Sequence, residues 1–201
     1  MSRFATVCLL AVSITTQTDA QAIPNSTLPP KGYGTLRQSD VVIVVRTADV
    51  HITILPLDER VTRLLVPDAH QALHAFYVDR RDELDAAAPR RGVEGTQVFL
   101  VTVYGASNFA RFDPEEITIS SRNRYFRPLA VLPVSPRWAE HQIDRGETLT
   151  ALYVFDRGLD PLHPLIVDYR GTRVATWERT LHRLEVERAR VVARARGGPS
   201  D

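Results

Sequence analysis

The order of apolar and polar residues along the chain predicts a series of β-strands. Residues 41–45 are an unbroken run of β-branched side chains, which is typical of a strand buried on both faces, and residues 97–104 alternate with a period of two. The same reasoning predicts strands at residues 51–55, 116–120, 125–132, 147–155 and 165–169. Because turn signals rather than helices separate the strands that follow residue 97, we expect antiparallel pairing in a sandwich or barrel.

Two other segments have the period of a helix. Asp68 precedes Gln71 by three residues, a start signal that resembles a capping box, so we expect a helix over about residues 68–88. Apolar residues at three- and four-residue spacing predict a C-terminal helix over about residues 177–196. The expected fold class is mostly β (α+β): an antiparallel β-sandwich with an inserted helix and a C-terminal helix.

The first 22 residues have the three parts of a secretory signal peptide. Arg3 gives a positive start, residues 4–14 are an uncharged apolar run, and residues 20–22 form a small-x-small cleavage site. The apolar run is shorter than the roughly 20 residues that cross a bilayer. We therefore expect cleavage before Ile23, an exported protein that is periplasmic or secreted, and no transmembrane segment after cleavage.

The rest of the chain is expected to form one domain over residues 39–196. Pro- and Gly-containing stretches predict a flexible N-terminal segment at residues 23–38 and a flexible tail at residues 197–201. The one cysteine, Cys8, lies in the predicted signal peptide, so the mature protein would hold no disulfide and no thiolate site. The chain has 25 Lys and Arg against 24 Asp and Glu, and this near-neutral balance argues against a nucleic-acid partner.

One segment resembles a known family. Tyr125 and Pro128 form a tyrosine-x-x-proline step, and Gly146 and Glu147 precede an apolar strand that ends at Phe155. With these features, residues 112–155 resemble the telokin-like, immunoglobulin-type β-sandwich modules of secreted bacterial proteins of unknown function. The resemblance implies an immunoglobulin-like sandwich that acts as an extracellular interaction module rather than as an enzyme.

The strongest candidate for chemistry is a pair of histidines in the predicted inserted helix. His70 and His74 lie four residues apart, so they share a helix face and both could bind one Zn²⁺. Gln71 occupies the position of the general-base glutamate in the metalloprotease motif and cannot take up a proton, which excludes that mechanism. A third ligand would have to come from a distant histidine, His141 or His163. The alternative is that both histidines are half-exposed neighbours of the apolar stripe, with no cofactor.

Three further patterns bear on catalysis or binding. The sequence from Gly105 to Phe109 begins like a nucleophile elbow, but Phe109 is too bulky for the second glycine position. Trp138 lies in a Pro-rich loop, where it either contacts a sugar or a partner, or closes the end of the sandwich, and we favour the second interpretation. Basic residues near the C-terminus either touch an anionic partner or lie on a solvated helix face: Arg188, Arg190 and Arg194.

The functional expectation follows from these patterns. The first hypothesis is an exported, non-catalytic module that binds a protein or a cell-envelope component of unknown identity. The second is a metal-binding or metal-dependent protein that uses His70 and His74. The third is a carbohydrate-binding module that uses Trp138 and nearby carboxylates.

Overall fold

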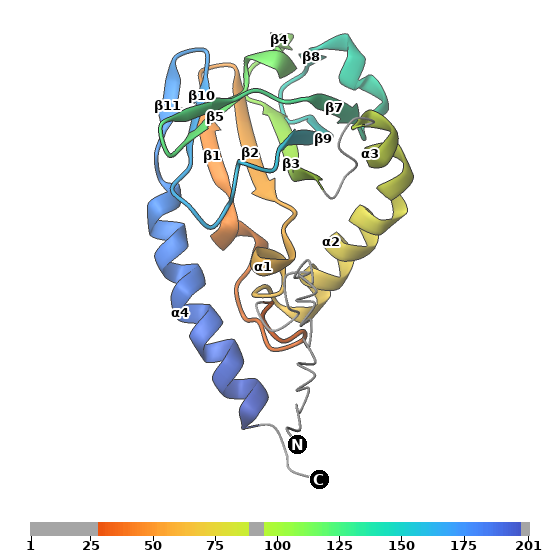
Figure 1. The fold of residues 1–201 in the computed structure, drawn as a ribbon. Coiled ribbons are helices and arrows are strands. Elements are labelled where there is room, and N and C mark those ends of the chain that lie inside the picture. The colour runs from red at the N-terminus through yellow and green to blue at the C-terminus, as the bar shows by residue number, and fades with distance from the viewer. Residues whose placement is uncertain (1–27, 89–94, 198–201) are drawn as a thin grey trace, which may run out of the picture.

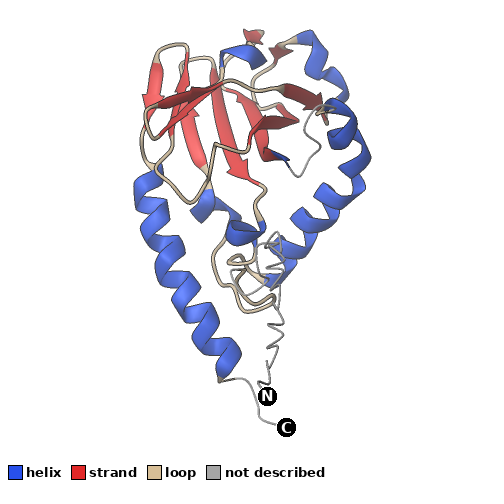
Figure 2. Cartoon of the chain, viewed as in Figure 1, coloured by secondary structure: helices blue, strands red, loops and turns tan. Residues whose placement is uncertain are grey.

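Antiparallel sheets form the upper part of the molecule in Figure 1, with α2 and α3 on one side and α4 on the other. The computed structural model describes residues 28–88 and 95–197. Figure 2 shows the strands gathered in one part of the molecule, with long helices on both sides of it. The prediction of an antiparallel, strand-rich α+β fold with a C-terminal helix is confirmed.

The larger sheet has five strands in the order β1-β2-β3-β9-β7. Their bounds are β1 (Ile43–Arg46), β2 (Val50–Pro56), β3 (Thr96–Gly105), β9 (Thr148–Asp156) and β7 (Ala130–Pro133). The longest pairing joins β3 and β9, with Val101 opposite Ala151. These strands are central because their apolar runs are buried on both faces over much of their length.

A second sheet has four strands in the order β11-β10-β5-β6. Its strands are β11 (Thr172–Val174), β10 (Ile166–Tyr169), β5 (Thr118–Ser121) and β6 (Arg124–Phe126), and a separate pair joins β4 (Ala110–Arg111) to β8 (Gln142–Ile143). Ile119 and Val167 of the four-stranded sheet share one hydrophobic core with Tyr153 and Phe155 of the larger sheet.

The predicted strand at residues 125–132 is wrong as a single strand. It divides into β6 and β7, which belong to different sheets. Pro128 lies between them, and proline has no N–H to donate to a strand partner. The chain therefore leaves one sheet before this residue and enters the other after it.

The helices lie where the sequence predicts helices, but there are more of them than were predicted. The predicted helix at residues 68–88 is present as two helices, α2 (Pro67–Asp79) and α3 (Arg81–Ala87), which meet at Arg80. The C-terminal helix α4 (Trp177–Arg196) has the predicted bounds. A short helix, α1 (Glu59–Thr62), was not predicted. Among the residues that the structure describes, no helix is both long enough and apolar enough to span a membrane.

Part of the segment that was expected to be flexible packs on the domain. Leu36 forms a parallel bridge with Leu65, through hydrogen bonds from the Leu36 amide to the Leu64 carbonyl (3.1 Å) and from the Val66 amide to the Leu36 carbonyl (2.9 Å). The bridge forms because Gly34 allows close approach: a Cβ there would lie 2.2 Å from the Leu65 carbonyl oxygen. The predicted signal peptide lies outside the described residues, as does most of the predicted tail.

Candidate metal site

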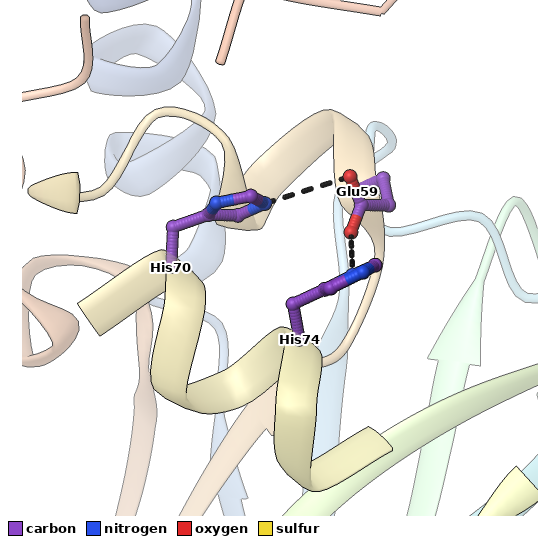
Figure 3. Close-up of side chains that lie close together, drawn as sticks. All are labelled: Glu59, His70 and His74. Atoms are coloured by element: carbon purple, nitrogen blue, oxygen red, sulfur yellow. Dashed lines mark hydrogen bonds and ion pairs between the residues drawn. The ribbon is translucent and has the colours of Figure 1, made fainter. Parts of the chain in front are cut away.

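Helices α1 and α2 bring three potential metal ligands together. His70 and His74 lie one turn apart on α2, and Glu59 is the first residue of α1 (Figure 3). Glu59 Oε1 lies 2.8 Å from His74 Nδ1, and Glu59 Oε2 lies 3.5 Å from His70 Nε2. The three ligand atoms all lie within 4.8 Å of one another. The third residue beside the histidine pair is therefore a carboxylate.

The position of Glu59 follows from the way α1 begins. Asp58 caps the helix by accepting a hydrogen bond from the Arg60 amide at 2.8 Å. The Arg60 guanidinium pairs with both Asp58 and Asp160, at 2.6 and 3.0 Å, which ties α1 to the segment after β9. These contacts fix the start of the helix, and Glu59 is directed towards α2 (Figure 3).

Glu59 is held as a carboxylate. Burial alone would raise its pKa, but hydrogen bonds from Arg63 and His74 outweigh that effect and leave the pKa below its ordinary value. Arg63 Nε donates to Glu59 Oε2 at 2.5 Å, so Oε1 is the oxygen closer to His74. Glu59 is therefore a charged carboxylate whose Oε2 atom is held by Arg63, and a carboxylate held in this way is the form that binds a cation.

His70 is the buried member of the cluster. The residue is 8% exposed, and burial lowers the pKa of its imidazole, against the opposing effect of Glu59. Its Nε2 atom is buried and has no hydrogen-bond partner among the residues that the structure describes. The 3.5 Å separation from Glu59 is within the range of an ion pair but is long for a hydrogen bond. A neutral imidazole with a buried, unpaired nitrogen is suited to a metal bond.

The donor set matches a known type of zinc site. Two histidines and one glutamate are ligands of catalytic zinc, in which a fourth position is open to water or substrate. Bonds of about 2.0–2.2 Å in tetrahedral geometry place ligand atoms about 3.3 Å apart. The 2.8 Å contact to His74 is made by Oε1 and the 3.5 Å contact to His70 by Oε2, so a single oxygen does not make both contacts. The three ligand atoms lie within 4.8 Å of one another, so binding of one ion would require side-chain rotation and loss of the proton that His74 Nδ1 donates to Glu59.

The cluster opens onto a cleft of about 970 Å³. His74 and Glu59 contribute to its wall, so the exposed side of the cluster faces this space. The apolar part of the lining includes Leu57, Leu73 and Val98. The charged lining residues come from several elements: Asp58, Glu59, Arg60, Arg81, Arg122, Arg157, Asp160 and Arg188.

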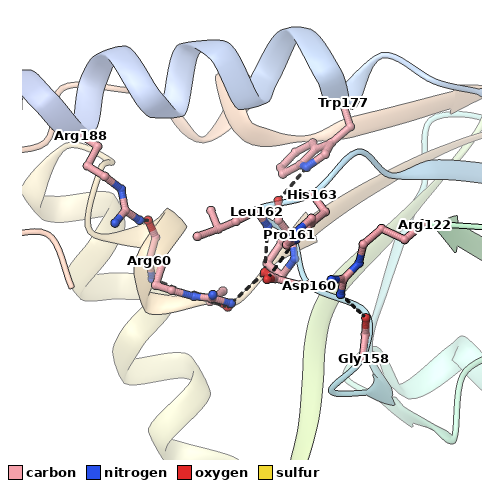
Figure 4. A network of polar contacts seen from close by, with 10 residues as sticks. Arg60, Arg122, Gly158, Asp160, Pro161, Leu162, His163, Trp177 and Arg188 are labelled. Carbon is pink, nitrogen blue, oxygen red and sulfur yellow. Dashed lines mark hydrogen bonds and ion pairs between the residues drawn. The ribbon is translucent and has the colours of Figure 1, made fainter. Parts of the chain in front are cut away.

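A polar network holds one wall of this cleft (Figure 4). Asp160 accepts hydrogen bonds from Arg60 and from the Leu162 amide, both at 3.0 Å, and its second oxygen lies 3.1 Å from His163 Nδ1. The Trp177 indole donates to the Pro161 carbonyl at 2.8 Å. The segment after β9 is thereby joined to both α1 and α4.

The predicted third ligands do not lie in the cluster. His163 pairs with Asp160, and His141 lies at the end of a 3₁₀ helix with its ring 5.8 Å from that of Phe112. Sequence reasoning missed Glu59, although Asp58 before it is a capping residue and could have indicated a helix start. Gln71 is exposed, and Arg81 lies 3.9 Å from Asp85.

The residues predicted to bind partners have separate surroundings. Trp138 is 2% exposed and lies edge-on to Phe112, so its ring is packed against core residues rather than exposed to solvent. Arg188 lines the cleft, Arg190 is exposed, and Arg194 pairs with the buried Glu187. These arginines therefore do not act as one solvated face.

Comparisons of the chain with protein-family models, with curated proteins and with solved structures found no match. The family resemblance of residues 112–155 stays a prediction.

Proposed function

We propose that this protein binds a zinc ion through Glu59, His70 and His74. The observation that carries the proposal is the convergence of three ligand atoms within 4.8 Å, one of which is a buried nitrogen without a hydrogen-bond partner among the described residues. An unsatisfied buried polar atom costs about 1–3 kcal/mol, and a metal bond at His70 Nε2 would remove that cost.

The surroundings of the cluster support an open zinc site. Arg63 hydrogen-bonds one oxygen of Glu59, as residues beyond the ligands commonly do for a carboxylate that binds metal. His74 is more exposed than His70 and reaches the cleft. The fourth coordination position would therefore face the cleft, where water or a ligand can enter.

A different explanation is that the cluster is only an ion-pair network. In that case Glu59 would serve to join α1 to α2 through Arg63, His70 and His74. The two explanations differ in one measurable property, because a network of this kind requires no ion.

Zinc titration against a chromophoric chelator separates the two explanations. We expect one zinc ion per chain, and a loss of affinity of more than about 100-fold in His70→Ala and in His74→Ala, since each removes one of three ligands. His163→Ala is the matched control, because it removes a histidine that is also paired with a carboxylate. Equal zinc binding in all four proteins, or no binding in the wild type, would overturn the proposal.

For the architecture and the location of the protein, we propose the finer features that the sequence predicts. The shared core of the two sheets supports a β-sandwich, and the resemblance of residues 112–155 supports an immunoglobulin-like one. The pattern of residues 1–22 supports export to the periplasm or beyond, which N-terminal sequencing of the mature protein would test.

A second candidate function is the exported interaction module. Two large apolar side chains favour it, Tyr125 on β6 and Leu129 between β6 and β7, which are 78% and 54% exposed. Large apolar side chains with this exposure occur where a protein partner binds. If this is so, a photo-crosslinker at position 125 should capture one defined protein in cells. The control is a photo-crosslinker at the position of Asp79, which is exposed on α2 and should capture none.

A further inference from the structure

We propose that the cleft beside the zinc site binds an organic phosphate, with its phosphate group against the arginines and the fourth position of the ion, and with an apolar body against the cleft wall. The proposal rests on the proposed function, because it places the phosphate at the open side of the Glu59, His70 and His74 cluster. It names the class of ligand that this cleft would take.

The charge of the lining supports an anionic ligand. Five arginines line the cleft, against three carboxylates: Arg60, Arg81, Arg122, Arg157 and Arg188 against Asp58, Glu59 and Asp160. Asp58 and Asp160 both pair with Arg60 and together offset two of the five positive charges, and Arg81 lies 3.9 Å from Asp85, which is outside the lining. The lining as a whole is still cationic, and the field of such a cleft attracts anions.

The arginines converge from parts of the chain that are far apart in sequence. Arg60 comes from α1, Arg81 from α3 and Arg188 from α4, while Arg157 follows β9. Arg122 lies in the turn between β5 and β6, and its guanidinium reaches the Gly158 carbonyl oxygen at 3.3 Å (Figure 4). Arg122 and Asn123 have φ of 48° and 59°, as expected for the two loop residues of the tight hairpin that joins β5 to β6.

The protein would compensate only part of the charge of the ion. Glu59 is the one carboxylate in the cluster, and part of its charge is matched by Arg63. A zinc ion there would keep a net positive charge, and the cleft adds further positive charge. A dianionic phosphate would compensate the charge of the ion and that of the arginines. Its oxygens also accept the paired N–H donors of a guanidinium better than those of a singly charged group do.

The remaining lining fits an apolar body. Leu57, Leu73, Tyr77, Val98 and Leu162 contribute to the wall. The volume of about 970 Å³ lies at the upper end of the range of about 300–1,000 Å³ for small-molecule sites. An aromatic or aliphatic phosphate monoester would therefore bury its body while its phosphate contacts the charged side.

Calorimetric titration of phenyl phosphate into the zinc-loaded protein tests this inference. We expect binding that weakens about 10-fold in Arg122→Gln and in Arg188→Gln, because each loses a charge-assisted contact. Arg190→Gln is the matched control, since Arg190 lies on the same helix, is exposed and lies outside the cleft lining. Benzoate should bind at least 10-fold more weakly than phenyl phosphate, because it carries a single charge.

The outcomes separate this inference from the proposed function. Zinc binding with no binding of phenyl phosphate or of phosphatidic acid vesicles, or with equal affinity in all the arginine variants, would overturn the phosphate site and leave the zinc site standing. Benzoate as tight as phenyl phosphate would also overturn it. A protein that does not bind zinc overturns both. A phosphate on a lipid surface shares this chemistry, so co-sedimentation with vesicles of phosphatidic acid in phosphatidylcholine is the second arm, and binding in either arm that requires Arg122 supports the inference.

Discussion

Glu59 Oε1 lies 2.8 Å from His74 Nδ1, although the two residues are on different helices and fifteen positions apart. The contact exists because Asp58 caps α1 and Arg60 ties that helix to Asp160. With His70 on the next turn of α2, the pair becomes a cluster of three ligand atoms. A short helix thus converts two spaced histidines into a candidate zinc site.

The first prediction concerns the pH dependence of stability without metal. Burial lowers the folded-state pKa of His70 below its ordinary value of 6.5, despite Glu59, while His74 and Lys31 act in the same direction as burial. The unfolded chain therefore binds the proton first, so stability is fully present above about pH 6.5 and is lost as pH falls through the folded pKa. Urea unfolding should show this loss between pH 7 and 5.

The variant His70→Gln should reduce that loss, because it removes the group whose pKa differs between the two states. His51→Gln, which removes an imidazole on β2, is the control and should leave the slope as in the wild type. A slope that His70→Gln does not change would show that another group carries the pH dependence. Glu59 and Asp160 do not compete in this window, since the pKa of each is held below its ordinary value, which is 4.5 for Glu59 and 3.8 for Asp160.

The second prediction concerns Gly34. Alanine there would place a Cβ 2.2 Å from the Leu65 carbonyl oxygen, so the N-terminal segment would have to move and break its bridge to Leu65. We expect Gly34→Ala to lower the free energy of unfolding by about 3 kcal/mol. Gly32→Ala is the control: its φ of 86° strains an alanine, but the space is open, so about 1 kcal/mol is expected. Similar values for the two variants would contradict the close approach.

The third prediction concerns a buried carboxylate on α4. Glu187 is 2% exposed and accepts hydrogen bonds from the Thr35 amide, the Thr35 hydroxyl and Arg194. Glu187→Ala should cost about 2–4 kcal/mol in thermal or urea unfolding, because charged hydrogen bonds are lost and their donors are left behind. Glu185→Ala, an exposed change on the same helix, should cost less than about 0.5 kcal/mol. If both variants are equally stable, the N-terminal segment does not depend on Glu187.

The fourth prediction concerns a contact within the shared core. The Tyr153 hydroxyl on β9 donates to the Pro114 carbonyl at 3.1 Å, and burial raises the pKa of this hydroxyl well above its ordinary value of 10. Tyr153→Phe should lower stability by about 1 kcal/mol, since the buried carbonyl loses its donor. Tyr125→Phe should leave stability unchanged, because Tyr125 is exposed. Equal stability of both variants and the wild type would show that this hydrogen bond does not contribute.

Several elements could be predicted from the sequence because their local pattern is strong. The helix at residues 177–196 and the strands around residues 97–104 and 147–155 carry long apolar patterns, and the structure has them at these places. The strands β4, β8 and β11 could not be predicted in this way, because two or three residues are too few to show a period.

The sequence predicted only part of the candidate site, because only part of it has a local pattern. The spacing of His70 and His74 is local, so the sequence shows that they share a helix face. Glu59 belongs to a helix too short to leave a periodic pattern, and its distance from His74 depends on how α1 packs on α2. The orientation of a short helix depends on tertiary contacts, here the ion pair of Arg60 with Asp160, and spacing along the sequence does not predict such contacts.

The most direct test of the zinc site is X-ray absorption at the zinc edge on protein loaded with one equivalent of zinc. Two imidazole nitrogens and a carboxylate oxygen are predicted at about 2.0–2.2 Å, with one imidazole contribution lost in His74→Ala. A spectrum in which zinc keeps its water shell, or one that His70→Ala and His74→Ala leave unchanged, would contradict the account.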